Sequence, residues 1–253
     1  KPLNLFINER NKMGRSLRSE DALLLVKLLE MQRHALLMYT SCGWFFDELS
    51  GLETVQILQY AGRAMQLAER SCQQDIESRF LERLALAGSN IPEFGNGAGI
   101  YASFVKPAMI DLIKVGAHYA VSSVFEEYGE ETDIFSYRAF KEDFLLLPAG
   151  QMKLAVGRVY IRSEITRKAD RISFCTLYFG GHALNCGVRS FLGEQEYSAM
   201  KREVVAAFNG SDFAAIIRLM DIHFGMHTYS LKNLFRDEQR HVLQLIIAGT
   251  LQE

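Results

Sequence analysis

Two alternating segments in the middle of the chain constrain its fold more than any other feature. Residues 152–162 (MKLAVGRVYIR) and 171–179 (RISFCTLYF) alternate in polarity and are rich in β-branched and aromatic residues, a pattern typical of half-buried strands. A short polar turn around residues 166–170 lies between them, so we expect an antiparallel hairpin. A pair of glycines then leads to a third short strand at about 183–191. Three strands are stable only when other elements cover one face, so we expect helices to pack on them.

The segments on both sides of this sheet have helical periodicity. Residues 20–40 follow a helix-start signal of Ser19, Glu20 and Asp21 and are apolar on nearly every face. We expect a helix this apolar to be surrounded by other helices. Apolar residues at three- and four-residue spacing also predict helices elsewhere. These further helices are expected at 53–86, from about 101, and at 107–128, 136–146, 196–208, 211–223 and 230–248.

The order of these segments predicts a mostly α (α+β) protein. We expect a helical bundle with a small antiparallel β-sheet of about three strands inserted before the C-terminal helices. A single domain over 1–253 would then consist of a helical bundle (1–147), a β element (148–193) and C-terminal helices (194–253). A chain of 253 residues can bury a substantial core. Because the first residue is Lys1, we expect the chain to be a fragment of a larger protein.

Charge and apolar content argue against several classes of function. The formal net charge is only −2, which gives no electrostatic reason to expect nucleic acid or an anionic membrane as partner. No uninterrupted apolar run approaches the roughly 18 residues of a membrane span. The four cysteines form no CxxC pair, which argues against a zinc knuckle or a disulfide framework. We therefore expect a cytoplasmic protein without metal or cofactor.

A cluster of aromatic and acidic residues follows the first apolar helix. Trp44, the only tryptophan, stands beside Phe45 and Phe46, and Asp47 and Glu48 come next. Flat aromatic faces can cover the C–H surface of a sugar ring, while carboxylates accept hydrogen bonds from its hydroxyls. Alternatively, the three aromatics close the helix end as buried core, because pooled aromatics are more often core than site. Adjacent carboxylates point about 100° apart on a helix, so we do not expect a catalytic acid/base pair.

Several polar side chains interrupt apolar helical segments. Arg33 and His34, together with Glu30, lie in the first apolar helix, and His118 lies beside Tyr119 in a later one. Burying such groups is costly unless they pair with each other or face a cavity. This cost favours a polar cleft near Arg33 and His34. For His118 two interpretations stay open, a hydrogen-bonded core histidine or a side chain that faces a site.

Two other motifs indicate chemistry only weakly. His223 and His227 are four residues apart, so on one helix they could share a metal. A glycine stands between them and the H-E-x-x-H glutamate is missing, so helix-end histidines are the alternative. The glycines of residues 95–99 resemble a phosphate-binding loop but lack the Lys and Ser/Thr that would follow. We expect the loop at 88–99 to be a turn-rich connection or a lid.

Residues 29–51 (LEMQRHALLMYTSCGWFFDELSG) form a long motif with a family resemblance. The motif closely resembles the uncharacterised C-terminal domain that follows the catalytic barrel in bacterial proteins related to glycoside hydrolase family 57. The resemblance spans nearly the whole chain. It also includes the segments SNIPE (89–93), HYA (118–120), FGGH (179–182), GVR (187–189), YSL (229–231) and FRDEQ (235–239).

The resemblance implies a helical domain next to a barrel that acts on α-glucans, and in related enzymes such a domain lends aromatic residues to the sugar cleft. The catalytic carboxylates belong to the barrel of that glycoside hydrolase or glucanotransferase, so no catalytic residue is expected here. The implied partners are the N-terminal catalytic barrel of the same polypeptide and an α-glucan or malto-oligosaccharide. The alternative is a purely structural or interaction domain that packs on the barrel. The candidate substrate-binding residues are Trp44, Phe45, Phe46, Asp47, Arg33, His34 and His118.

Overall fold

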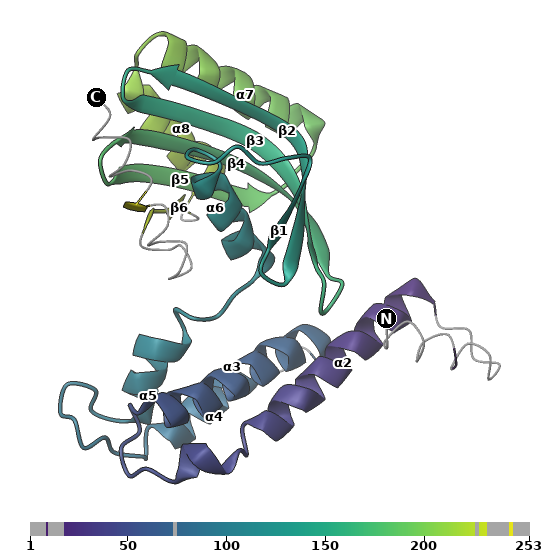
Figure 1. The fold of residues 1–253 in the computed structure, drawn as a ribbon, viewed down its shortest axis with the longest axis vertical. Helices are drawn as coiled ribbons and strands as arrows, with labels where there is room; N and C mark the ends of the chain where they lie inside the picture. The colour runs from purple at the N-terminus through teal and green to yellow at the C-terminus, as the bar shows by residue number, and fades with distance from the viewer. Residues whose placement is uncertain (1–8, 10–17, 73–74, 226–227, 232–242, 245–253) are drawn as a thin grey trace. The chain divides into compact units, whose positions relative to one another are not determined.

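The computed structural model describes residues 9, 18–72, 75–225, 228–231 and 243–244. Contacts divide the chain into two compact units (Figure 1), unit 1 (Lys1–Met109) and unit 2 (Ile110–Glu253). Among the helices described here, none is both long enough and apolar enough to cross a membrane.

Unit 1 is mainly helical in its described part (Figure 1). Its first two long helices, α2 and α3, pack against each other. A short 3₁₀ helix, η1, lies between them in the sequence and contacts α3. The elements are α2 (Ser19–Leu37), η1 (Ser41–Trp44), α3 (Leu52–Cys72), α4 (Ile76–Leu84), α5 (Gly97–Ile100) and the π-helical turn η2 (Tyr101–Val105).

The core of unit 1 forms where α3 meets α5 and η2. The helical spacing of α3 predicts one apolar face, and the structure confirms it, because Val55, Leu58, Ala61, Met65 and Ala68 are all buried. The helix expected over 53–86 is interrupted, however. A new helix, α4, begins after Asp75, whose carboxylate accepts a hydrogen bond from the Ser78 amide at 3.1 Å. Such an N-cap satisfies an amide that a helix start leaves unpaired.

The environment of α2 differs from the expectation that other helices surround it. Its only buried described side chain is Val26. Leu24, Leu29 and Leu36 remain 42%, 44% and 65% exposed. Helix α2 packs on α3, and its remaining described apolar residues are half-buried or exposed.

Unit 2 is built around a six-stranded antiparallel sheet whose strands follow sequence order. Helix α6 (Leu112–Ser122) covers one face of the sheet, and α7 (Glu194–Asn209) and α8 (Phe213–Phe224) cover the other (Figure 1). The strands are β1 (Glu131–Ile134), β2 (Tyr137–Ala149), β3 (Met152–Ser163), β4 (Ala169–Gly180), β5 (Ala183–Ser190) and β6 (Thr228–Tyr229).

The alternation that predicts strand β3 also explains how the sheet holds two cores. Ala155 and Val159 belong to the cluster around α6, whereas Leu154 and Val156 belong to the cluster around α7 and α8. Successive side chains in a strand point to opposite faces. A strand covered on both faces is therefore buried along most of its length.

The prediction of a mostly helical bundle with about three strands is wrong. Residues 136–146, expected as a helix within the 1–147 bundle, are largely strand β2. A β-bulge between Lys141 and Asp143 breaks the two-residue period of this strand, and the apolar run that follows does not alternate. The expected strands at 152–162, 171–179 and 183–191 are confirmed as β3, β4 and β5. The helix expected at 230–248 falls mostly outside the described residues.

Candidate functional site

The residues Trp44–Asp47, which we call the aromatic segment, project from unit 1 into solvent. Trp44 is 68% exposed, Phe45 81% and Phe46 51%. Phe45 and Phe46 pack edge-to-face, with ring centroids 5.1 Å apart, and Asp47 is exposed as well. The alternative in which these aromatics form a buried plug at the helix end is therefore wrong for this chain.

Gly43 fixes the aromatic segment at its beginning. It is the buried residue of η1, and a Cβ at this position would lie 2.5 Å from Cγ2 of Ile57 in α3. Only glycine lets the η1 backbone approach α3 this closely. The Thr54 hydroxyl adds a hydrogen bond, since its Oγ1 donates to the Gly43 carbonyl at 3.2 Å. Gly43, the residue before Trp44, is thus held against α3.

Glu48 fixes the aromatic segment at its end. Its carboxylate accepts hydrogen bonds from the Ser50 amide (2.9 Å), the Ser89 hydroxyl (2.8 Å) and the Asn90 amide (2.7 Å). These bonds, led by the one from the Ser50 amide, lower the pKa of Glu48 to about 2. The Asn90 side-chain amide also donates to the Asp47 carbonyl at 3.2 Å. The loop that begins at residue 88 therefore borders the aromatic segment.

This role of Glu48 is one that sequence reasoning missed. Glu48 and Ser89 are 41 residues apart, and no local periodicity relates them. Both lie in the segments that carry the family resemblance, 29–51 and 89–93. Their co-occurrence in that resemblance was the one available signal that these two segments meet.

Arg33 and His34 lie one turn before the end of α2 and pair with a residue of the same helix. Among the described residues, their ion pairs are with Glu30, at 3.9 Å from Arg33 Nε and 3.7 Å from His34 Nε2. The His34 ring lies 5.8 Å from the Tyr60 ring, and burial is the main cause that lowers the pKa of His34. Glu30 thus lies within ion-pair distance of both candidates on this helix. Of the two, Arg33 is exposed and His34 is half-buried.

His118 belongs to α6 in unit 2, whereas the aromatic segment belongs to unit 1. Its side chain is buried, and burial lowers its pKa to about 4. A histidine with this pKa is neutral near pH 7. The side chain also lines a pocket of about 200 Å³ beside Asp133 and Phe135, so burial and a place at a cavity occur together at His118.

The metal hypothesis receives no support within the described residues. His227 lies outside them, and His223 Nε2 lies 2.9 Å from a carboxylate oxygen of Glu203. In the part of the chain that the structure covers, no three His, Cys, Asp or Glu side chains are grouped so that they could hold a metal ion.

The glycine-rich loop has a structural use for its amides. Asn96 caps α5, and its side-chain oxygen accepts from the amides of Ala98 (3.0 Å) and Gly99 (3.2 Å). A phosphate-binding loop needs such amides free to face the ligand. The loop therefore serves as a helix start rather than as a phosphate cradle.

These features define an α+β protein whose helical unit presents a firmly held aromatic segment. Residues 2–235 match a family described as a domain of unknown function (DUF3536), and the chain belongs to that family. No curated protein matches the chain. No solved structure matches it either.

Proposed function

We propose that the chain is an accessory carbohydrate-binding domain of a glycoside hydrolase family 57-like protein, and that its aromatic segment stacks on an α-glucan. The exposure of Trp44, Phe45 and Phe46 on a segment held at both ends carries this proposal. The chemistry of bond cleavage would belong to an N-terminal catalytic barrel of the same polypeptide. The domain would complete the glucan-binding cleft without catalytic carboxylates of its own.

The energetics of the aromatic segment favour ligand binding. Covering a large apolar side chain contributes about 1.5–3 kcal/mol, and this free energy is still available in a side chain that stays exposed after folding. Ordering a mobile loop on binding costs free energy. Gly43 and Glu48 already hold the segment in place, so this cost is largely met when the protein folds.

The side chains have separate roles in this proposal. Trp44 and Phe45, the more exposed of the three aromatics, cover the C–H faces of neighbouring glucose units. Phe46 supports Phe45 through their edge-to-face contact. Asp47 accepts hydrogen bonds from sugar hydroxyls, and Arg33 is exposed and offers donors from the end of α2.

The single tryptophan provides the test, because all indole fluorescence comes from Trp44. Titration with a long malto-oligosaccharide should produce a saturable change in emission, and a β-linked oligosaccharide of equal length should produce none. By calorimetry, Trp44→Ala should weaken glucan binding about tenfold or more. Leu86→Ala, an 86% exposed residue of the same unit, is the matched control and should bind normally. A Trp44→Ala variant with unchanged affinity would overturn the proposal.

A second candidate function is docking onto the catalytic barrel, and the exposed leucines of α2 favour it. Leu29 and Leu36 are seven residues apart, which places them on one helical face, and both are exposed. In the full-length polypeptide, a Leu29→Ser, Leu36→Ser double substitution should then speed limited proteolysis between barrel and domain. A docking role predicts this change without loss of glucan affinity by the isolated chain, whereas an unchanged cleavage rate contradicts it.

A further inference from the structure

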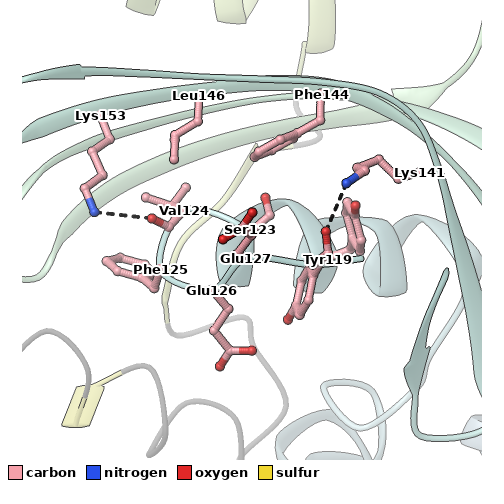
Figure 2. Close-up of a pocket in the computed structure, with 11 residues that line it drawn as sticks. Tyr119, Ser123, Val124, Phe125, Glu126, Glu127, Lys141, Phe144, Leu146 and Lys153 are labelled. Atoms are coloured by element: carbon pink, nitrogen blue, oxygen red, sulfur yellow. Dashed lines mark hydrogen bonds between the residues drawn. The ribbon is translucent and has the colours of Figure 1, made fainter. Parts of the chain in front are cut away.

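Unit 2 contains a pocket of about 430 Å³ between the sheet and the segment that follows α6 (Figure 2). Phe144 and Leu146 of β2 point into it from the sheet, and Phe125 lines it from the opposite side. Lys153 and Lys141 stand at its two ends. This volume lies within the range of roughly 300–1,000 Å³ that is usual for small-molecule sites.

The β-bulge of β2 brings Lys141 to this pocket. Residues that pair across neighbouring strands share a face, and Lys141 pairs with Val159, a residue of the α6 side. Lys141 and Phe144 are three positions apart, so in a regular strand they would point to opposite faces. The extra residue of the bulge places both on the α6 face, where each lines the pocket. Bulges often occur beside functional sites because they re-aim a side chain in this way.

Backbone carbonyls orient both lysines. Lys141 Nζ donates to the Tyr128 carbonyl at 3.0 Å, and Lys153 Nζ donates to the Val124 carbonyl at 3.4 Å (Figure 2). Lys141 Nζ also lies 3.3 Å from a carboxylate oxygen of Glu130. An ammonium group has three N–H donors, so the carbonyls hold each lysine in position and leave donor capacity for a ligand.

Side chains of both charges line the pocket. Its lining contains two lysines and two glutamates, Glu126 and Glu127, so the lining residues carry no net formal charge. The lysines disfavour a cation. The glutamates and the carbonyl-rich C-terminal end of α6 both disfavour an anion. A neutral ligand that both donates and accepts hydrogen bonds suits this lining best.

We propose that this pocket binds a neutral polyhydroxylated ring, that is, a single sugar unit. Phe125 and Phe144 would cover the apolar C–H faces of the ring. Lys153 would donate to its oxygens, and Glu127 would accept from its hydroxyls. The site uses residues of unit 2 alone and is independent of the aromatic segment, so it stands or falls separately from the proposed function.

Ligand-observed saturation-transfer NMR on the full chain tests the charge argument. Trp44→Ala and Phe45→Ala substitutions first remove the aromatic segment as a second binding place. The probes are glucose, anionic glucuronate and, at slightly acidic pH, cationic glucosamine. Glucose should receive saturation, and the two charged sugars should bind at least about tenfold more weakly. Equal binding of a charged sugar, or no transfer to any of the three, would overturn the proposal.

Two charge variants sharpen this test. Lys153→Met should weaken glucose binding about tenfold and shift the preference toward glucosamine. Glu127→Gln, at an exposed position, should shift the preference toward glucuronate. Glu196→Gln on α7, on the opposite face of the sheet, is the matched control and should leave all three sugars unchanged. The pocket proposal fails if the preferences do not move, and the Trp44 titration of the unsubstituted chain is unaffected by that outcome.

Discussion

Helix α2 of unit 1 and strand β3 of unit 2 are both strongly apolar, yet they bury very different amounts of surface. In β3, Leu154, Ala155 and Val156 are fully buried. In α2, Val26 is the only buried described residue. Helices cover β3 on both faces, whereas α2 packs on α3 along one side. Apolar content therefore sets how much surface a segment can bury, while the number of covering layers sets how much it does bury.

The two proposed sites differ in the same way, because one lies on an open surface and the other lies in a pocket. Unit 1 offers an open apolar surface that a large, extended ligand or a protein partner can cover. Unit 2 buries the apolar residues of its central strands, and its described residues line a pocket of about 430 Å³. The ligand proposed for unit 1 is therefore a polymer, and the ligand proposed for unit 2 is a single ring.

The largest expected effect is a loss of stability in the doubly covered sheet. Phe174 is fully buried and packs against Tyr119, with ring centroids 5.8 Å apart. Phe174→Ala should lower the free energy of unfolding by about 3–5 kcal/mol, as measured by denaturant unfolding followed by circular dichroism. Ile222→Ala, at a 75% exposed position of the same unit, should change it little. Equal effects of the two substitutions would contradict the close packing of Phe174 in the sheet.

A smaller loss of stability is expected from a substitution where η1 approaches α3. Gly43→Ala would place a Cβ 2.5 Å from Ile57 Cγ2, and such overpacking costs about 1–3 kcal/mol. A double-mutant cycle with Ile57→Ala measures the clash. The double variant should be less destabilised than the sum of the single variants, because removing the Ile57 side chain relieves the overlap. Simple additivity would contradict the close contact.

The next expected effect is a loss of stability at acid pH, when the Glu48 carboxylate becomes protonated. The folded-state pKa of Glu48, about 2, lies below its ordinary value of 4.5. The charged carboxylate therefore stabilises unit 1 above about pH 4.5, and this contribution is lost as the pH falls toward 2. Glu48→Gln should remove that part of the pH dependence, with urea midpoints read from Trp44 emission. Glu93→Gln, an exposed residue of the bordering loop, should keep it; identical pH profiles for Glu48→Gln and the unsubstituted chain would refute the assignment.

The smallest effect is expected on the open face of α2. Leu36 is 65% exposed, so Leu36→Ser should change the free energy of unfolding by no more than about 0.5 kcal/mol. Val26→Ala, at the buried position of the same helix, should cost about 1.5 kcal/mol. Denaturant unfolding of both variants measures the contrast. A Leu36→Ser variant as unstable as Val26→Ala would show that α2 is covered in solution.

Strands β3 and β4 and the apolar face of α3 were predictable because each has one unbroken periodicity. Strand β2 was not, because its bulge shifts the alternation by one residue and the leucines beyond it read as part of a helix. Because of this bulge, the sequence pattern did not predict β2 as part of the sheet. It also hid the contribution of Lys141 to the pocket.

The candidate site was predictable in composition but not in exposure. The sequence alone supports both a buried and an exposed arrangement of Trp44, Phe45 and Phe46, since burial depends on which surface η1 presents. Exposure follows from Gly43, which turns the backbone side of η1 toward α3. The hydrogen bonds of Glu48 to Ser89 and Asn90 depend on tertiary contacts. Such contacts have no signature in local spacing.

The hydrogen bonds that Glu48 accepts from Ser89 and Asn90 join two distant stretches of sequence into one structural unit. An insertion or deletion in a surface loop is usually tolerated, but one between residues 88 and 91 would act directly on the backbone that carries Trp44. Relatives that differ in the length of this loop should therefore differ in the position of the aromatic segment, even where every aromatic residue is retained. In protein engineering, changes in this loop would shift the aromatic segment without altering the aromatic residues themselves.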